Sequence, residues 1–137
     1  MENEDRHIEE LLNDLIQRPS DEFPKKGSTK AVGVPPSPGV YVVFSPTGSV
    51  VHVGRTQRGR GGLQQRLDNH LYGQSSFAEK YLKPPPHRDL RRGYKFRYLV
   101  VQKDKERAFL EALAIGKLCP KHLGLGEKAR QRRHTKH

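Results

Sequence analysis

The chain lacks the residues and segments on which several protein classes depend. It has one cysteine, Cys119, among 137 residues, which excludes an internal disulfide framework and a zinc site built from cysteines. Its longest apolar runs, such as residues 40–44, fall far short of the roughly 20 residues of a transmembrane helix. The first residues are acidic and precede no apolar run of the secretory type. We therefore expect a protein that is not secreted and is cytoplasmic, or nucleoid-associated if bacterial.

Acidic residues are scarce beyond the first segment. Residues 1–23 hold 8 of the 15 acids and 2 of the 26 bases, which leaves 7 acids and 24 bases for residues 24–137. The net charge is thus −6 on the first segment and +17 on the rest. A body this basic attracts polyanions, so nucleic acid is the first partner to consider and an anionic membrane surface the second.

The length fits one small domain with flanking segments. Apolar residues at helical spacing over residues 8–16, with acids between them, predict an amphipathic helix within residues 1–18. Residues 19–37 are rich in proline and read as a connector. We expect the main domain at residues 38–123 and a basic tail at 124–137, disordered until it meets a polyanion.

Within the main domain, strand and helix patterns alternate. Two β-branched runs flank Ser45-Pro46-Thr47-Gly48, which matches a type I turn and predicts a hairpin. Helical spacing, proline positions and a further β-type run predict the other elements: helices at 63–72, 77–82 and 104–118, and a third strand at 94–101.

Tyr41 and His52 lie on the two strands of the hairpin, and their relation depends on its register. If Ser45 closes on Gly48, Tyr41 lies opposite His52 on one face. If Gly48 forms a bulge, His52 turns to the other face. The sequence leaves both registers open, and Tyr41 could also be an ordinary strand aromatic packed in the core.

Glu111 is the only polar residue within the apolar stretch 108–115 of the last helix. A partly buried carboxylate needs a cation. The simpler partner is Arg107, one turn earlier, in a structural ion pair. The alternative is a divalent metal.

Arg66 and His70 lie four residues apart on a helix and therefore share one edge of it. They could face a common cleft, although such a pair is often only a solvated helix edge. The loop before this helix mixes glycines with Arg55, Arg58 and Arg60, a composition that suits phosphate contacts through side chains and amides.

Together, these pieces resemble the GIY-YIG nuclease family over roughly residues 38–123. The resemblance lies in their order: Gly39-Val40-Tyr41, then His52-Val53-Gly54, then Arg66 and His70, then Glu111 with Pro120 beyond it. It implies an α+β fold with a three-stranded antiparallel sheet flanked by helices, which agrees with the elements predicted above.

The resemblance also implies a metal-dependent DNA endonuclease that uses one Mg²⁺ or Mn²⁺ ion. Tyr41 matches the tyrosine often assigned as the base, Arg66 the arginine that binds the scissile phosphate, and Glu111 the metal ligand. His70 stands where members carry His or Tyr, and Arg55 where several carry a basic residue. Phosphodiester hydrolysis needs an activated water, a metal that offsets developing charge, and cations on the phosphate oxygens.

Two positions depart from the family pattern. His52 replaces the tyrosine of the second motif, where it could relay a proton, orient a water or mark a degraded site. Leu123 stands where an asparagine commonly follows the final proline, with His122 before it.

The sequence leaves three functions open. The leading one is an endonuclease on duplex or branched DNA, with Arg55, Arg58 and Arg60 on the backbone and no membrane partner. The second is an inactive module that binds DNA or RNA. In the third the chain is a subunit of a repair or restriction complex, whose acidic helix docks on a partner or covers its own basic cleft through residues 8–16.

Overall fold

The computed structural model of the chain describes residues 2–57, 61–82 and 88–123. Arg58 and Arg60 and the basic tail at 124–137 lie outside these ranges, so the functions predicted for them stay predictions. The domain boundaries predicted from the sequence also stay predictions.

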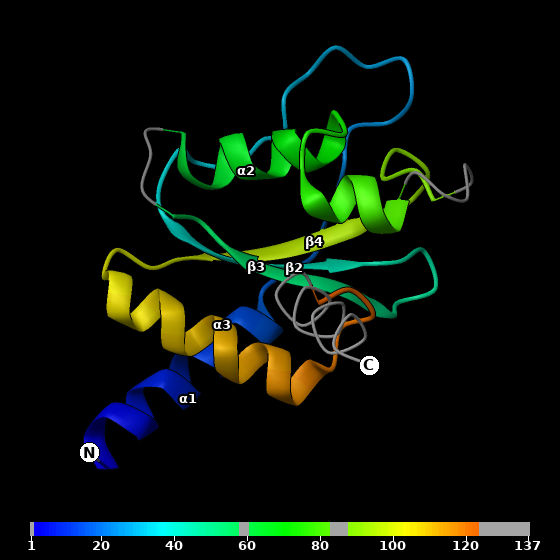
Figure 1. Cartoon of the computed structure of the whole chain (residues 1–137). Coiled ribbons are helices and arrows are strands. Elements are labelled where there is room, and N and C mark those ends of the chain that lie inside the picture. Colours follow the sequence, from blue (N-terminus) through cyan, green and yellow to red (C-terminus); the bar gives the residue numbers. More distant parts are fainter. Residues whose placement is uncertain (1, 58–60, 83–87, 124–137) are drawn as a thin grey trace, which may run out of the picture.

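A four-stranded antiparallel sheet forms the centre of the α+β fold (Figure 1). Its strands are ordered β1 (Asp21–Glu22), β4 (Lys95–Val100), β2 (Gly39–Phe44) and β3 (Val50–Arg55). The predicted α+β class is confirmed, and the three predicted strands gain a fourth. This extra strand has only two residues and pairs with β4 at the sheet edge, which is too short for a period-two pattern to reveal it.

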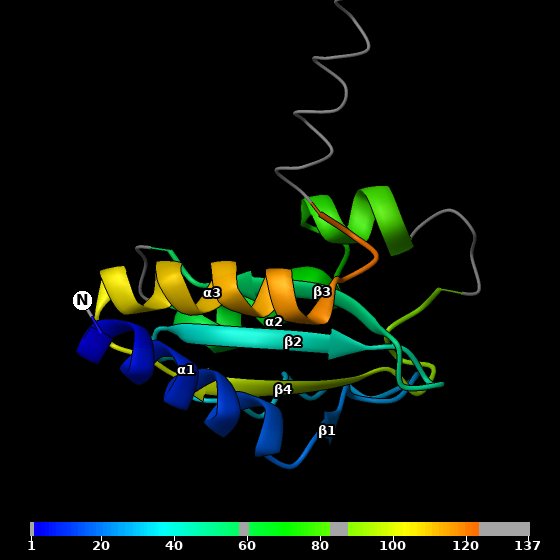
Figure 2. The same ribbon diagram turned by 90° about the horizontal axis from the view of Figure 1, so that it is seen from below.

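Helices cover both faces of the sheet (Figures 1 and 2). On one face lie α2 (Gly62–Leu71) and the short helix η1 (Ala78–Leu82), and on the other lie α1 (Glu2–Gln17) and α3 (Asp104–Leu118). Consequently β2 is apolar at successive positions: Tyr41 and Val43 enter one buried cluster, and Val40 and Val42 the other. A strand buried on both faces reads as a continuous apolar run.

The acidic helix α1 packs onto the domain itself. Ile8, Leu12 and Leu15 are buried in one cluster with Leu110 of α3, on the sheet face opposite α2 (Figure 2). The self-docking predicted for residues 8–16 is therefore observed, and it takes place on the sheet face opposite α2. Within the described ranges, none of the helices has the length and apolar character to cross a membrane.

The β2–β3 hairpin contains two irregularities. Gly48 closes the predicted turn onto Ser45 with a positive φ of 92°, so Phe44 pairs with Val50. One further residue is then inserted in β3, and Val43 pairs with His52 and Tyr41 with Gly54. Tyr41 therefore lies opposite Gly54, and the pairing at this point matches neither of the two registers that the sequence left open.

Each irregularity moves the pairing by one residue, and a shift of one residue reverses the face of every side chain. The two shifts together restore the face. His52 therefore lies on the same face of the sheet as Tyr41, two residues along β3 from Gly54, which pairs with Tyr41. Ring centroids of these two residues lie 5.7 Å apart.

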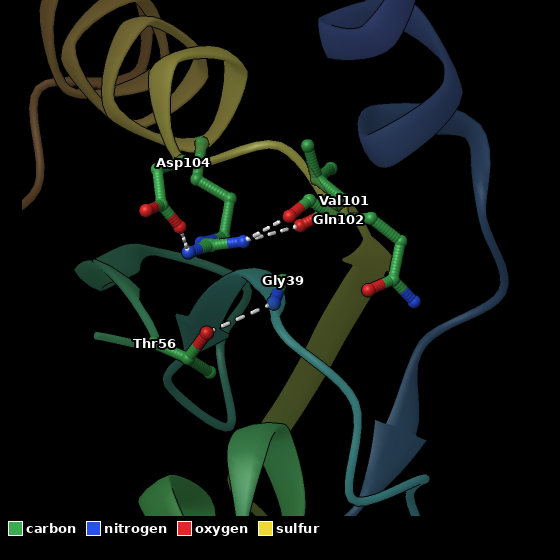
Figure 3. Close-up of polar contacts among 6 residues, drawn as sticks. Gly39, Thr56, Val101, Gln102 and Asp104 are labelled. Carbon is green, nitrogen blue, oxygen red and sulfur yellow. Dashed lines mark hydrogen bonds and ion pairs between the residues drawn. The ribbon is translucent and has the colours of Figure 1, made fainter. Parts of the chain in front are cut away.

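The start of α3 is fixed by Arg107. Its guanidinium donates to the carbonyls of Val101 (2.9 Å) and Gln102 (2.8 Å) and pairs with Asp104. Figure 3 shows these acceptors near the beginning of β2, where the Thr56 hydroxyl accepts the Gly39 N–H at 3.1 Å. The Arg107 guanidinium is thus bound by the segment that leads into its own helix, α3.

Candidate active site

Tyr41 lies at the centre of a buried polar cluster. Its side chain is 0% exposed, and its hydroxyl lies 2.6 Å from Nε2 of His70 and 3.4 Å from Nε2 of His52. The phenol passes directly over Gly54, where a methyl group would overlap the hydroxyl. Gly54 of the second motif is therefore required for Tyr41 to reach the histidines.

Ser75 extends this cluster to the helix beyond α2. Its Oγ lies 2.6 Å from Nδ1 of His70 and accepts the N–H of Ala78 at 3.1 Å. The hydroxyl thus caps the short helix and holds the His70 ring from behind. Sequence reasoning missed Ser75, although serine three residues before an amide at a helix start is the usual capping signal.

Aromatic rings fix the position of His52. Its ring stacks on Phe77 with centroids 4.4 Å apart and planes 9° apart, and the ring of His122 lies 5.3 Å away. The backbone N–H of His122 donates to the Val51 carbonyl at 2.9 Å, which brings the segment after α3 beside β3. His52 Nδ1 has no hydrogen-bond partner among the described residues.

Arg66 supplies the positive charge of the site. Its guanidinium acts to lower the pKa of Tyr41, and the same charge acts to lower the pKa of Glu111. It also disfavours protonation of His52 and His70. One cation on α2 therefore acts on residues from two strands and two helices.

Burial sets the protonation states of the cluster. It raises the pKa of Tyr41 to about 12, because the favourable charge of Arg66 only partly offsets the loss of hydration. Burial lowers the pKa of His52 to about 3, with the charges of His122 and Arg66 adding to the effect. The pKa of His70 is also held well below its usual value. In this state the phenol keeps its proton and both imidazoles are neutral.

Glu111 reaches the same region from α3. Its carboxylate pairs with Nε of Arg55 at 3.5 Å, and the two side chains are 23% and 33% exposed. Burial raises the pKa of Glu111, whereas Arg55, Arg66 and a hydrogen bond from the Arg55 backbone lower it. The simpler alternative of an ion pair with Arg107 is wrong, because Arg107 is held by Val101, Gln102 and Asp104.

The donor set suits only a cation that needs few protein ligands. No group of three or more His, Cys, Asp or Glu residues in the described part of the chain could hold a metal. A partly exposed carboxylate fits Mg²⁺ or Mn²⁺, because Mg²⁺ keeps several waters and often takes only one or two protein carboxylates. The neighbouring histidines are buried and turned toward Tyr41, so Glu111 is the residue that would hold it.

The structure thus brings Tyr41, His52, Arg66 and His70 together on the side of the sheet that carries α2, and the charge of Arg66 also acts on Glu111 of α3. Arg55 joins them through Glu111, and Arg58 and Arg60 fall outside the described residues. Leu123 is only partly buried, whereas His122 before it is 2% exposed and contacts the ring cluster. His122 is therefore the side chain that the segment after Pro120 brings to the site.

No family model matches the sequence, and no curated protein matches it. Among solved structures, the chain is similar to the GIY-YIG N-terminal endonuclease domain of UvrC from Thermotoga maritima bound to its catalytic divalent cation, magnesium. It is equally similar to a point mutant of that domain bound to its catalytic cation. Each has a TM-score of 0.48 and 25% identity, over 66% of this chain and 86% of the other.

Proposed function

We propose that the chain is a metal-dependent DNA endonuclease that hydrolyses phosphodiester bonds at the site around Tyr41. The observation that carries this proposal is the contact of the Tyr41 hydroxyl with His70 at 2.6 Å, one turn from Arg66 on α2, together with the charge of Arg66 on both Tyr41 and Glu111. A phosphate that binds Arg66 would therefore lie close to a phenol oxygen and to a carboxylate. These are the groups that hydrolysis of a phosphodiester requires.

Each residue then has a distinct part in the reaction. Arg66 binds a non-bridging phosphate oxygen and offsets the charge that develops there. Tyr41 receives a hydrogen bond from the attacking water, and His70, backed by Ser75, fixes the phenol in place. Glu111 holds the single divalent cation, which when bound supplies a Lewis acid for the phosphate. Tyr41 can act as a base only if its pKa falls, and the Arg66 guanidinium already acts in that direction.

DNA is the proposed substrate because the described basic residues beside the site suit a polyanionic backbone. Arg55 lies at the end of β3 and is partly exposed. Arg58 and Arg60 follow in the sequence, and we propose that they extend this contact along duplex or branched DNA. Contacts with phosphates carry no sequence information directly, so they predict affinity without a defined cutting sequence.

A module that binds nucleic acid without cutting it is the second candidate. One observation favours it: the pKa of Tyr41 is raised to about 12 and that of His52 lowered to about 3. Neither is a ready base at neutral pH. In this case the replacement of the second-motif tyrosine by His52 marks a site that has lost its activity.

A supercoiled-plasmid assay with Mg²⁺, Mn²⁺ or EDTA separates the two candidates. We expect nicking with either metal, none with EDTA, and none by Glu111→Ala. Glu106→Ala is the matched control, because it removes one acid from the same helix at a position that pairs with His7. If neither the wild type nor the variants nick the plasmid under any of these conditions, but all of them bind DNA, the binding module is supported instead.

A further inference from the structure

Arg55 pairs with Glu111 across the contact between β3 and α3. Its side-chain Nε lies 3.5 Å from Oε1 of Glu111. The charge of Arg55 acts to lower the pKa of this carboxyl, against the effect of burial. If the guanidinium leaves, the carboxylate loses this partner and becomes available to a cation.

Among the described residues near α3, no other basic side chain is placed to take over this pair. Arg107, one turn earlier, is 5% exposed and bound to three oxygens of its own segment. Arg66 approaches Glu111 only as a neighbouring charge. The carboxylate that fits a divalent cation is therefore occupied by a single movable cation.

The guanidinium of Arg55 has space to move. A cavity of about 330 Å³ lies beside it, lined by Arg55, Thr56, Gln57, Asp104 and Arg107. The Arg55 side chain is one-third exposed, so solvent reaches it in the paired state. A phosphate that enters this cavity would meet Arg55.

We propose that Arg55 competes with the divalent cation for Glu111 and that its guanidinium, once released, binds a DNA phosphate. This inference rests on the proposed function. It makes Arg55 a positioning residue that keeps Glu111 neutralised until the cation is bound, and that couples cation binding to DNA binding. Such coupling is reciprocal: whatever frees Arg55 from Glu111 must also strengthen its contact with DNA.

The first test measures Mn²⁺ binding to the full chain by calorimetry in the absence of DNA. Removing the competing cation should tighten binding, so we expect Arg55→Ala and Arg55→Gln to bind Mn²⁺ about threefold to thirtyfold more tightly than the wild type. Arg55→Lys, which keeps the charge, should stay closer to the wild type. Arg6→Ala is the matched control, because it removes one exposed positive charge from α1.

The second test measures DNA affinity in EDTA with a fluorescent duplex. We expect Glu111→Gln to bind DNA about twofold to tenfold more tightly than Glu106→Gln, because only the former releases Arg55. In an Arg55→Ala background this difference should disappear. The comparison needs neither metal nor cleavage, and circular dichroism checks that each variant is folded.

The outcomes distinguish the inference from the proposed function. If Glu111→Gln abolishes Mn²⁺ binding but Arg55→Ala binds Mn²⁺ no more tightly than the wild type, the inference is wrong and the metal site stands. If Glu111→Gln binds DNA no better than Glu106→Gln, the release of Arg55 is also refuted. If Mn²⁺ binding does not depend on Glu111 at all, both the inference and the proposed metal site fail.

Discussion

Acid should destabilise this fold through the histidines that are buried in neutral form. His52 is 9% exposed and His70 is 1% exposed, and burial lowers the pKa of each below its usual value of 6.5. An unfolded chain takes up protons on both as the pH falls through 6.5, whereas the folded chain does not. Stability contributed by these groups is therefore present above pH 6.5 and is lost progressively below it.

The size of the effect follows from the pKa of His52, which is about 3 when the chain is folded. Between pH 6.5 and pH 3, each unit by which the pH falls lowers the free energy of unfolding by about 1.4 kcal/mol for one such group. At pH 5.0 His52 alone should therefore reduce the free energy of unfolding by about 2 kcal/mol. His70 acts in the same direction. This loss is a large fraction of the roughly 5–15 kcal/mol that stabilises a typical domain.

Urea denaturation at pH 7.5 and pH 5.0, followed by circular dichroism, measures this loss. The variant to compare is His52→Phe, which keeps a ring against Phe77 but cannot be protonated. We expect its loss between the two pH values to be about 2 kcal/mol smaller than that of the wild type. Since acidic residues titrate alike in both proteins, their contribution cancels in the comparison.

The reasoning is refuted if His52→Phe loses as much stability as the wild type between pH 7.5 and pH 5.0. That result would mean that His52 is as free to take up a proton in the fold as in the unfolded chain.

Three substitutions test the local geometry. Ser75→Ala removes the cap of the short helix and the contact with His70 and should cost about 1–2 kcal/mol in thermal denaturation, largely restored by Ser75→Thr; no change would show that the hydroxyl is dispensable. Gly54→Ala places a methyl group on the Tyr41 hydroxyl and should cost about 1–3 kcal/mol in urea denaturation, whereas Gly116→Ala, which has open space, should not. Arg66→Ala should slow single-turnover DNA cutting at least about 100-fold, and equal loss in Gln65→Ala would contradict a specific role.

Helical periodicity predicted the positions of the helix residues well. Arg66 and His70 share one edge of α2 because residues four apart lie on one face, and the structure brings both to Tyr41. Glu111 was identified because it is the only polar residue of an apolar stretch. Its partner could not be predicted, because Arg55 is remote in the sequence and approaches only through the packing of α3 on β3.

The hairpin shows why the rest of the site needed a structure. A single irregularity in its register would have turned His52 away from Tyr41, and only the pair of irregularities returns it. No sequence pattern states how many such irregularities occur. The contribution of His122 likewise depends on a backbone contact with Val51 that lies outside any predicted element.

We propose that one site both binds and cuts DNA and that Glu111 is needed only for cutting. We would measure the single-turnover cutting rate and the DNA affinity of the wild type and Glu111→Gln on the same labelled duplex in Mg²⁺, with Glu106→Gln as the control. We expect Glu111→Gln to cut at least about 100-fold more slowly than the wild type while it still binds the duplex at least as tightly as the control. A Glu111→Gln variant that cuts at the wild-type rate would contradict it.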